Sequence, residues 1–282
     1  MADPSRYDFP AIQTTFPAPF VAHVEINRPK NYNSFSPDVF SSLARVFDRL
    51  SEDENVRCIL LSGVGKHFSA GLDVKSASTS GPVSQTTEGE DIARRTWKIR
   101  RHMYGYQDGI NAVERCEKPV IVCCHGVAYG AAIDLALAAD IRYCSKDVRF
   151  SIKEVDVGLA ADVGTLTRLP KIGVSYSWAK EIVYTARDFA AEEAERAGFV
   201  SKVFETKDGL IKAGFELANF IATKSPVAVQ SSKALFDFSR DRTVQDGLLY
   251  TAAWNSPMVQ SDDVKKAMMS GVRKTKSTFE KL

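Results

Sequence analysis

Over its first two thirds the chain alternates short apolar runs, which are typical of strands, with segments that have helical spacing. Val21–Ile26, Val56–Leu61 and Pro119–Cys124 are predicted strands, and the unbroken apolar character of the second is typical of a strand covered on both faces. Between the first two, Ser36 precedes Pro37 as a helix N-cap would, and apolar residues then recur with helical spacing. Strands joined by helical crossovers predict an α/β core.

Further elements follow the same pattern until the chain becomes mostly helical. The polar segment Ser76–Gly89 is expected to form a mobile loop before a long helix that ends near Glu117. Next come a predicted helix at Ala131–Ala139 and short strands at Ile141–Cys144, Val148–Ile152 and Val200–Phe204. From about Val163 helices dominate, and the late ones are predicted at Asp208–Thr223, Pro226–Ser239, Thr243–Asn255 and Ser261–Gly271.

These elements divide the chain into three predicted parts. Residues 1–18 are rich in Pro and aromatic residues and are expected to form an arm without regular structure. Residues 19–207 form the predicted core, and residues 208–282 form a helical region. The apolar stripes of the late helices would pack either on the chain's own core or on a neighbouring subunit, because both arrangements produce the same pattern.

The composition argues against several classes of protein. The 282 residues have a formal net charge of +2, so global charge favours neither a nucleic-acid nor a membrane partner. No apolar run approaches the roughly 20 residues that cross a bilayer, so no membrane span is expected. The five cysteines lie mostly in apolar stretches such as Val120–Cys124, which is typical of buried free thiols in a reducing compartment.

Targeting features favour an intracellular protein. The amino-terminal residues have neither the basic start and apolar middle of a secretory signal nor the Arg-rich, acid-poor pattern of a transit peptide. The segment Phe279–Leu282 ends in Lys-Leu, as the peroxisomal Ser-Lys-Leu signal does, but Glu280 stands in the place of the small residue.

Gly65–Asp73 contains a turn of small residues directly after a predicted buried strand. Ser69, Ala70 and Gly71 would let a ligand approach the main chain, and the turn would leave the Leu72 amide free to point into a cavity. The alternative is an ordinary turn between a strand and a loop.

A second turn, within His125–Asp134, opens a predicted helix. Unpaired amides at a helix start, together with the helix dipole, stabilise a developing negative oxygen, and the Ala131 amide is the natural donor. With the Leu72 amide it would form a two-amide oxyanion hole. The alternative is that these small residues serve the close packing of a buried helix. The glycine spacing fits neither a phosphate loop nor a dinucleotide fingerprint.

The segment Ser151–Pro170 places Glu154, Asp156 and Asp162 among apolar residues. Desolvation and mutual repulsion should keep one carboxyl protonated while another stays ionised, which supplies an acid and a base at one pH. Together with Asp134 in the preceding segment, these acids are the candidate proton-transfer groups.

Each acid also has a structural alternative. Asp162 is well placed to cap a helix, and Asp134 falls in a first helical turn, where acids are favoured. Glu154 could pair with Lys153 or Arg168 at the surface.

Metal binding and serine hydrolysis are poorly supported by the sequence. Cys123, Cys124 and His125 are adjacent, so strand alternation would point them in different directions. The four histidines include no His-x-x-x-His pair, and no Gly-x-Ser-x-Gly elbow occurs. No metal ion is therefore expected.

The chain resembles the enoyl-CoA hydratase/isomerase (crotonase) superfamily at the three segments that hold the candidate residues, Gly65–Asp73, His125–Asp134 and Ser151–Pro170. The similarity runs from about Val21 to Gly271. Four segments are similar to the Δ3,5-Δ2,4-dienoyl-CoA isomerases in particular, namely Asp140–Cys144, Lys153–Leu166, Lys224–Ser231 and Ala253–Asn255. The resemblance implies a spiral of ββα units followed by carboxy-terminal helices that build trimers, usually paired into hexamers.

Carried over by position, the resemblance also implies roles for the candidate residues. Leu72 and Ala131 would donate the oxyanion-hole amides, and Ser69, Ala70, Gly71, Leu72 and Asp73 would line the channel for the CoA thioester. Glu154 is similar to the base at C2, Asp162 to the distal acid that protonates C6, and Asp134 to a third acid that orients or polarises the site. The family usually has consecutive glycines where this chain has Gly130-Ala131-Ala132, but both backbone amides remain.

The implied reaction is the isomerisation of a 3,5-dienoyl-CoA to a 2,4-dienoyl-CoA in fatty-acid β-oxidation. Its substrate is carried as the CoA thioester, no cofactor is needed, and the enzyme would be a homotrimer or hexamer in a peroxisome or mitochondrion. Two alternatives stay open. The first is an enoyl-CoA hydratase or Δ3-Δ2-enoyl-CoA isomerase, with Glu154 still central. The second is a non-catalytic RNA-binding relative, against which the balanced charge and the lack of an aromatic-basic strand motif argue.

Overall fold

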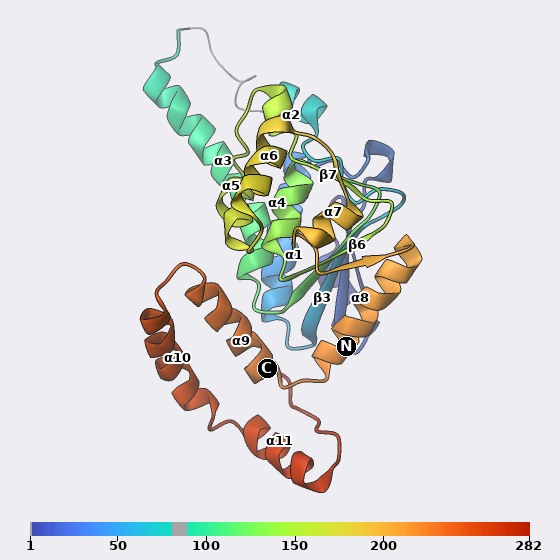
Figure 1. Cartoon of the computed structure of the whole chain (residues 1–282), viewed down its shortest axis with the longest axis vertical. Coiled ribbons are helices and arrows are strands. Elements are labelled where there is room, and N and C mark those ends of the chain that lie inside the picture. The colour runs from blue at the N-terminus through green and yellow to red at the C-terminus, as the bar shows by residue number, and fades with distance from the viewer. Residues whose placement is uncertain (1, 81–88) are drawn as a thin grey trace.

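A six-stranded sheet is the centre of the computed structural model, which describes residues 2–80 and 89–282 (Figure 1). The first two strands of its order are antiparallel, and every later neighbour is parallel. The order is β1 (Ile12–Ala18), β2 (Phe20–Ile26), β3 (Val56–Gly63), β4 (Val120–Cys124), β6 (Ile141–Ser145) and β9 (Lys202–Phe204). A smaller sheet contains β5 (Val127–Tyr129), β7 (Arg149–Ser151) and β8 (Phe189–Ala190).

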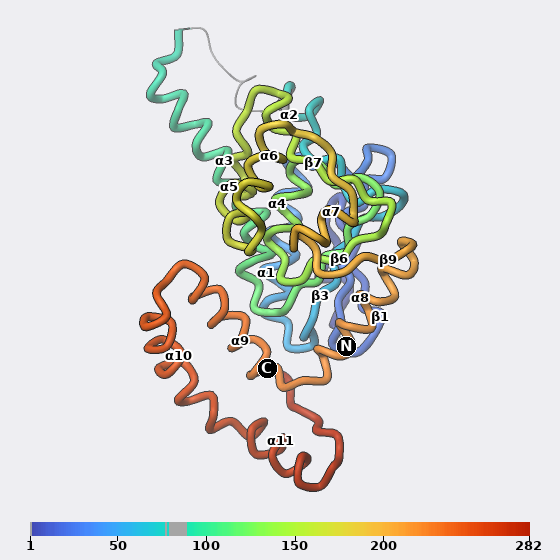
Figure 2. The backbone as a smooth tube through the Cα atoms, viewed as in Figure 1, coloured from blue at the N-terminus to red at the C-terminus, as the bar shows by residue number. Residues whose placement is uncertain are grey.

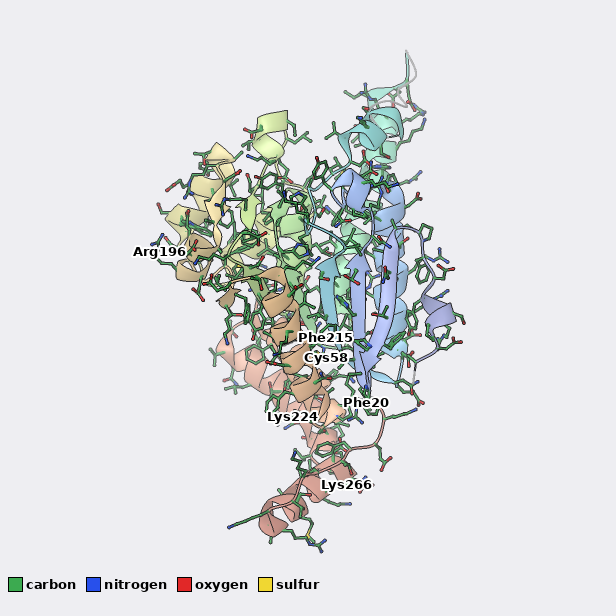
Figure 3. All side chains as sticks on the ribbon, turned by 90° about the vertical axis from the view of Figure 1, so that its right-hand side faces the viewer. Phe20, Cys58, Arg196, Phe215, Lys224 and Lys266 are labelled. Carbon is green, nitrogen blue, oxygen red and sulfur yellow. The ribbon has the colours of Figure 1, made fainter. Side chains whose placement is uncertain are left out.

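Helices cover both faces of the main sheet, as the unbroken apolar character of β3 predicts. On β3, Ile59 and Leu61 pack in the large core on one face, whereas Cys58 and Leu60 pack in a smaller core on the other. Figure 3 shows Cys58 beside Phe215 of α8, where that helix crosses the sheet. The large core is covered by α1 (Pro37–Glu52), α3 (Ile92–Arg115) and α4 (Ala131–Ala138), and the smaller one by α8 (Lys207–Ala222).

The prediction of an irregular arm over residues 1–18 is wrong for Ile12–Ala18. This segment is the edge strand β1, in which Thr14 pairs with Val24 of β2. Pro17 argues against a strand in the sequence, because proline is excluded from central strands. It is tolerated at a sheet edge, where β1 lies. Tyr7 is buried ahead of the strand, and its hydroxyl donates to Asp53 Oδ2 over 2.7 Å.

Two further differences from the sequence-based expectations concern short elements. Val74–Ser80 forms helix α2, so the prediction of a mobile loop over Ser76–Gly89 is wrong for its first residues, and its continuation at 81–88 lies outside the described residues. The two-residue strand β8 was not predicted, because two residues carry no readable periodicity. The segment after β7 contains a 3-10 helix, η3 (Glu154–Val157), and then α5 (Thr165–Arg168), η4 (Leu169–Lys171), α6 (Tyr176–Thr185) and α7 (Ala191–Arg196).

Three late helices extend away from the sheet, as the tube in Figure 2 shows most clearly. Lys233 of this region pairs with Asp140 at 2.8 Å. Arg57 of β3 donates to the main-chain oxygens of Phe279 and Glu280 over 2.7 and 2.9 Å, and so fastens the end of the chain to the sheet. No described helix is both long and apolar enough to cross a membrane. The late helices are α9 (Pro226–Ser239), α10 (Val244–Met258) and α11 (Asp262–Arg273), close to their predicted bounds.

Candidate active site

The turn after β3 leaves one backbone amide unpaired. Phe35 forms a parallel bridge with Leu72, in which the Phe35 amide donates to the Gly71 oxygen over 2.7 Å and the Asp73 amide donates to the Phe35 oxygen over 3.0 Å. This pattern places the Leu72 amide on the opposite edge of the segment. Among residues 2–80 and 89–282, no protein group accepts a hydrogen bond from it.

A second unpaired amide lies at the start of α4. Gly130 has a φ of +53°, which glycine adopts without steric cost, and its own amide donates to the Ser151 oxygen over 2.9 Å. Ala131 is the first residue of α4, so its amide has no partner within the helix, and the described part of the chain supplies no other acceptor. The helix dipole favours negative charge at this point.

The two turns are held against each other by main-chain hydrogen bonds. The Ser69 amide donates to the Val127 oxygen, and the Tyr129 amide donates to the Ser69 oxygen, each over 3.0 Å. The backbones approach so closely at Gly71 that a Cβ there would collide with the Tyr129 oxygen and lie 3.3 Å from the Ala131 nitrogen. The unpaired amides of Leu72 and Ala131 therefore lie in neighbouring parts of the two turns.

Glu154, the first residue of η3, brings a carboxylate to these amides. Its Oε1 atom lies 3.1 Å from the point that a Cβ on Gly130 would occupy, directly before Ala131. Its Oε2 atom is buried without a hydrogen-bond partner among the described residues. Burial, and then the negative charges of Asp134 and Asp162, raise the pKa of Glu154 to about 7. A carboxylate with this pKa is suited to accept a proton at neutral pH.

Asp134 is fully buried in the first turn of α4. Its Oδ1 atom accepts hydrogen bonds from the Thr165 amide over 2.5 Å and from the Thr165 hydroxyl over 2.8 Å. Burial raises the pKa of Asp134 to about 6, although the Thr165 bonds and the charge of Arg168 act in the opposite direction. Asp134 thus connects α4 to α5 and adds negative charge beside Glu154.

Asp162 is more exposed than the other two acids. It lines a cavity of about 230 Å³ together with Gln107, whose side chain donates to the Asp162 main-chain oxygen over 2.7 Å. Among the described residues, the lining of this cavity does not include Glu154. Burial raises the pKa of Asp162, and its charge in turn raises the pKa of Glu154. The charge of Asp162 therefore acts on Glu154 through space.

Comparisons with known proteins show the family to which this chain is similar. The sequence matches the enoyl-CoA hydratase/isomerase family over residues 19–281. The chain belongs to this family. It is 42% identical over 281 residues to the mitochondrial Delta(3,5)-Delta(2,4)-dienoyl-CoA isomerase of Mus musculus, an alignment that covers 99% of this chain and 85% of the relative. It is 44% identical over 262 residues to the peroxisomal enzyme of the same name from Arabidopsis thaliana, with 93% of both chains covered.

A solved structure confirms the fold of this hydratase/isomerase family member. The enoyl-CoA hydratase of Bacillus anthracis superposes with a TM-score of 0.86 at 24% identity, covering 96% of this chain and 99% of that one. The predicted α/β crotonase fold with carboxy-terminal helices is thus confirmed, as is the resemblance on which it was based.

The remaining predicted residues of this family member lie around the first turn. Ser69 is fully buried, and its hydroxyl donates to the Asn33 oxygen over 2.8 Å and accepts from the Gly71 amide over 3.1 Å. Asp73 pairs with Arg28 at 2.9 Å. The Ser69 and Asp73 side chains therefore hold the turn in shape, whereas Ala70 and Leu72 are exposed beside it.

Two structural alternatives for the acids are not seen in the structure. Gly164, and not Asp162, stands at the N-cap of α5. Lys153 pairs with Asp188 at 3.1 Å, and Arg168 pairs with Glu114 at 2.5 Å, so neither cation is the partner of Glu154. Asp134 does lie in a first helical turn, as predicted.

Thr165 is not among the residues predicted from the sequence, and Arg168 pairs with Glu114 and not with Glu154, the partner offered as an alternative. Both contact other elements through the fold, so no local pattern marks them. Cys123 and Cys124 pack on opposite faces of β4, and His125 Nε2 lies 3.0 Å from the Gly63 oxygen. In the part of the chain that the structure describes, no group of three or more His, Cys, Asp or Glu side chains is placed to hold a metal ion.

Proposed function

We propose that this chain isomerises 3,5-dienoyl-CoA to 2,4-dienoyl-CoA in fatty-acid β-oxidation, with Glu154 as the base. Relatives named for this reaction are 42% and 44% identical over almost the whole chain. The observation that carries the proposal is the position of the Glu154 carboxylate against the helix start that presents the Ala131 amide, with the Leu72 amide beside it.

The proposed mechanism moves one proton from C2 to C6 of the substrate. Glu154 removes the C2 proton, and the released electron pair passes to the thioester oxygen to form an enolate that is conjugated with both double bonds, a trienolate. The Leu72 and Ala131 amides stabilise this oxygen by hydrogen bonds that strengthen as its negative charge develops. Protonated Asp162 then donates to C6, and the electrons return to form the conjugated product. Transfer of the proton from Glu154 to Asp162 through solvent restores both groups, and no cofactor takes part.

The rival reaction is the hydration of a 2-enoyl-CoA, which the same oxyanion hole and Glu154 would serve. Structural neighbours include proteins titled enoyl-CoA hydratase. Offering the purified protein a 3,5-dienoyl-CoA and a 2-enoyl-CoA, and following ultraviolet absorbance, separates the two reactions. Dienoyl isomerisation brings the whole diene into conjugation with the thioester carbonyl, whereas hydration of a 2-enoyl-CoA removes conjugation.

Asp162→Asn is expected to lower turnover of the 3,5-dienoyl-CoA by about 100-fold or more, because the amide cannot donate the proton to C6 at a useful rate. The fold should persist, since Asp162 is exposed and its contact with Gln107 uses the main chain. Asp156→Asn is the matched control, because Asp156 is an exposed acid of the same segment and pairs only loosely with Lys153, at 3.8 Å. Near-full activity of the Asp162 variant would remove this residue from the mechanism.

We also propose that the chain acts on its acyl-CoA substrate as a homotrimer or hexamer in a mitochondrion or peroxisome. Large apolar side chains on the three late helices, each more than half exposed, would be covered by neighbouring subunits: Phe236, Leu248, Leu249, Met268 and Val272. Sedimentation equilibrium should give the mass of three or six chains, and Leu249→Glu should lower it. The mass of a single chain for the unaltered protein would contradict the proposal.

The two compartments are those named for the relatives, and immunolocalisation would test them.

A further inference from the structure

Arg168 is a buried cation at the end of α5, and three of its contacts reach helix α3. It is 7% exposed. Its Nε and Nη2 atoms donate to Glu114 Oε2 over 3.0 and 2.5 Å, and Nη2 also donates to Asn111 Oδ1 over 2.6 Å. A buried guanidinium held by several hydrogen bonds has one orientation, because breaking any of them leaves a charged group unsatisfied.

The Nη1 corner of this guanidinium lies on the side of Gly164 and Asp134. Its Nη1 atom fills the space in which a side chain on Gly164 would lie, and Asp134 Oδ1 is 3.6 Å from the same point. The guanidinium and the Asp134 carboxylate therefore both border the space beside Gly164. Thr165, the next residue, donates both of its hydrogen bonds to that same Asp134 oxygen.

The charged groups that face Asp134 come from two elements and the segment between them. Arg168 of α5 lowers the pKa of Asp134, and Asp162, which precedes α5, raises it. Glu154 of η3 interacts with Asp134 as a like charge. Glu114 of α3 faces the guanidinium instead, and it also accepts a hydrogen bond from Arg240 at the end of α9, over 2.5 Å.

We propose that Arg168 is a positioning residue that holds the Gly164–Thr165 turn against Asp134 and places a fixed positive charge beside the Asp134 carboxylate. This inference rests on the proposed function, in which Glu154 is the base, and adds that the neighbouring Asp134 acts as a carboxylate in the active form. Arg168 does not touch the substrate in this role. It acts through Asp134, and Glu114 fixes its guanidinium in place.

The test compares Arg168→Gln with Arg240→Gln, because both variants remove one arginine from Glu114 but only Arg168 faces Asp134. Carboxyl ¹³C signals of aspartate-labelled protein, with Asp134 assigned by Asp134→Asn, report the Asp134 titration directly. We expect Arg168→Gln to move its midpoint upward by about one pH unit, since an opposite charge within about 4–6 Å has this effect, and Arg240→Gln to leave it unchanged. Arg168→Lys keeps a positive charge, so the Asp134 midpoint should lie between those of the parent protein and Arg168→Gln.

Turnover of 3,5-dienoyl-CoA supplies the second measurement. The kcat of Arg168→Gln should fall about tenfold with KM little changed, whereas Arg240→Gln should keep both near the values of the parent protein. Equal Asp134 titrations in the two variants, or a shift in both, would overturn the proposal and leave Arg168 a structural residue. The carbon titration needs no substrate, so it gives its answer even if the protein does not isomerise dienoyl-CoA.

Discussion

Replacing Glu154 with Gln is expected to lower kcat for 3,5-dienoyl-CoA by about 100- to 10,000-fold, the usual range for the loss of a general base. Gln has nearly the same shape, so it should fill the space beside Gly130, but its amide cannot accept the C2 proton. Stopped-flow absorbance of the conjugated product measures the change. KM should move much less, because the base acts on the reacting carbon and not on the CoA.

The same substitution should make the protein more stable at alkaline pH. Burial and the charge of Asp134 raise the pKa of Glu154 from 4.5 to about 7, so the folded state binds this proton more tightly than the unfolded state does. The resulting contribution to stability is fully present below about pH 4.5 and is lost as the pH rises through 7. Gln avoids this loss. Urea unfolding should therefore show a gain of up to about 3 kcal/mol at pH 8 and almost none at pH 4.5.

The two measurements together separate catalysis from folding. A variant that is inactive and also less stable at pH 8 would mean that Glu154 stabilises the fold, and the pKa argument would fail. Glu154→Asp is the control for chemistry, because it keeps a carboxylate but withdraws it from Gly130. It should have an activity between those of the parent protein and the Gln variant. Full activity of Glu154→Gln would assign the base elsewhere.

The elements that could be predicted from the sequence are those with strong local periodicity. The unbroken apolar run of β3 predicts a strand with two covered faces, and Ile59 and Cys58 do pack on opposite sides. The strand β1 is not predicted, because proline is tolerated in a strand only at the edge of a sheet and this segment contains Pro17. Whether a strand lies at the edge depends on which strands pair with it, and β1 pairs with β2. Strand order is a property of distant segments, so no local pattern contains it.

The candidate site divides in the same way. The two turns have local signals, small residues directly after buried strands, and the structure brings the Leu72 and Ala131 amides together. Asp134, Glu154 and Asp162 are candidates because carboxylates in apolar surroundings are conspicuous in a sequence, but the groups that surround each acid are not predictable from it. Arg168 pairs with Glu114, which lies on another helix, so its sequence proximity to Glu154 was misleading. The pKa of each acid depends on its burial and on its distances from charged groups of other elements, and these are set only by the complete fold.

Ala131→Pro is expected to reduce kcat by about 100- to 1,000-fold, the typical cost of losing one oxyanion-hole donor. Ala131 is the first residue of α4, where proline fits the helix and where the missing amide had no helical partner to lose. The substitution therefore removes a hydrogen-bond donor from the reaction while the helix that carries Asp134 is kept. A matching thermal midpoint would show that the fold has survived.

Ala131→Gly is the matched variant, because it keeps the amide and removes only the methyl group. If the backbone donor is what matters, this variant should retain activity within a few-fold, at a cost to the helix of at most about 1 kcal/mol. A folded Ala131→Pro protein with more than a tenth of the parent activity would show that the Ala131 amide does not hold the thioester oxygen. Equal losses in the Pro and Gly variants would instead assign the effect to the methyl group. The pair thus tests the main-chain donor separately from the alanine side chain.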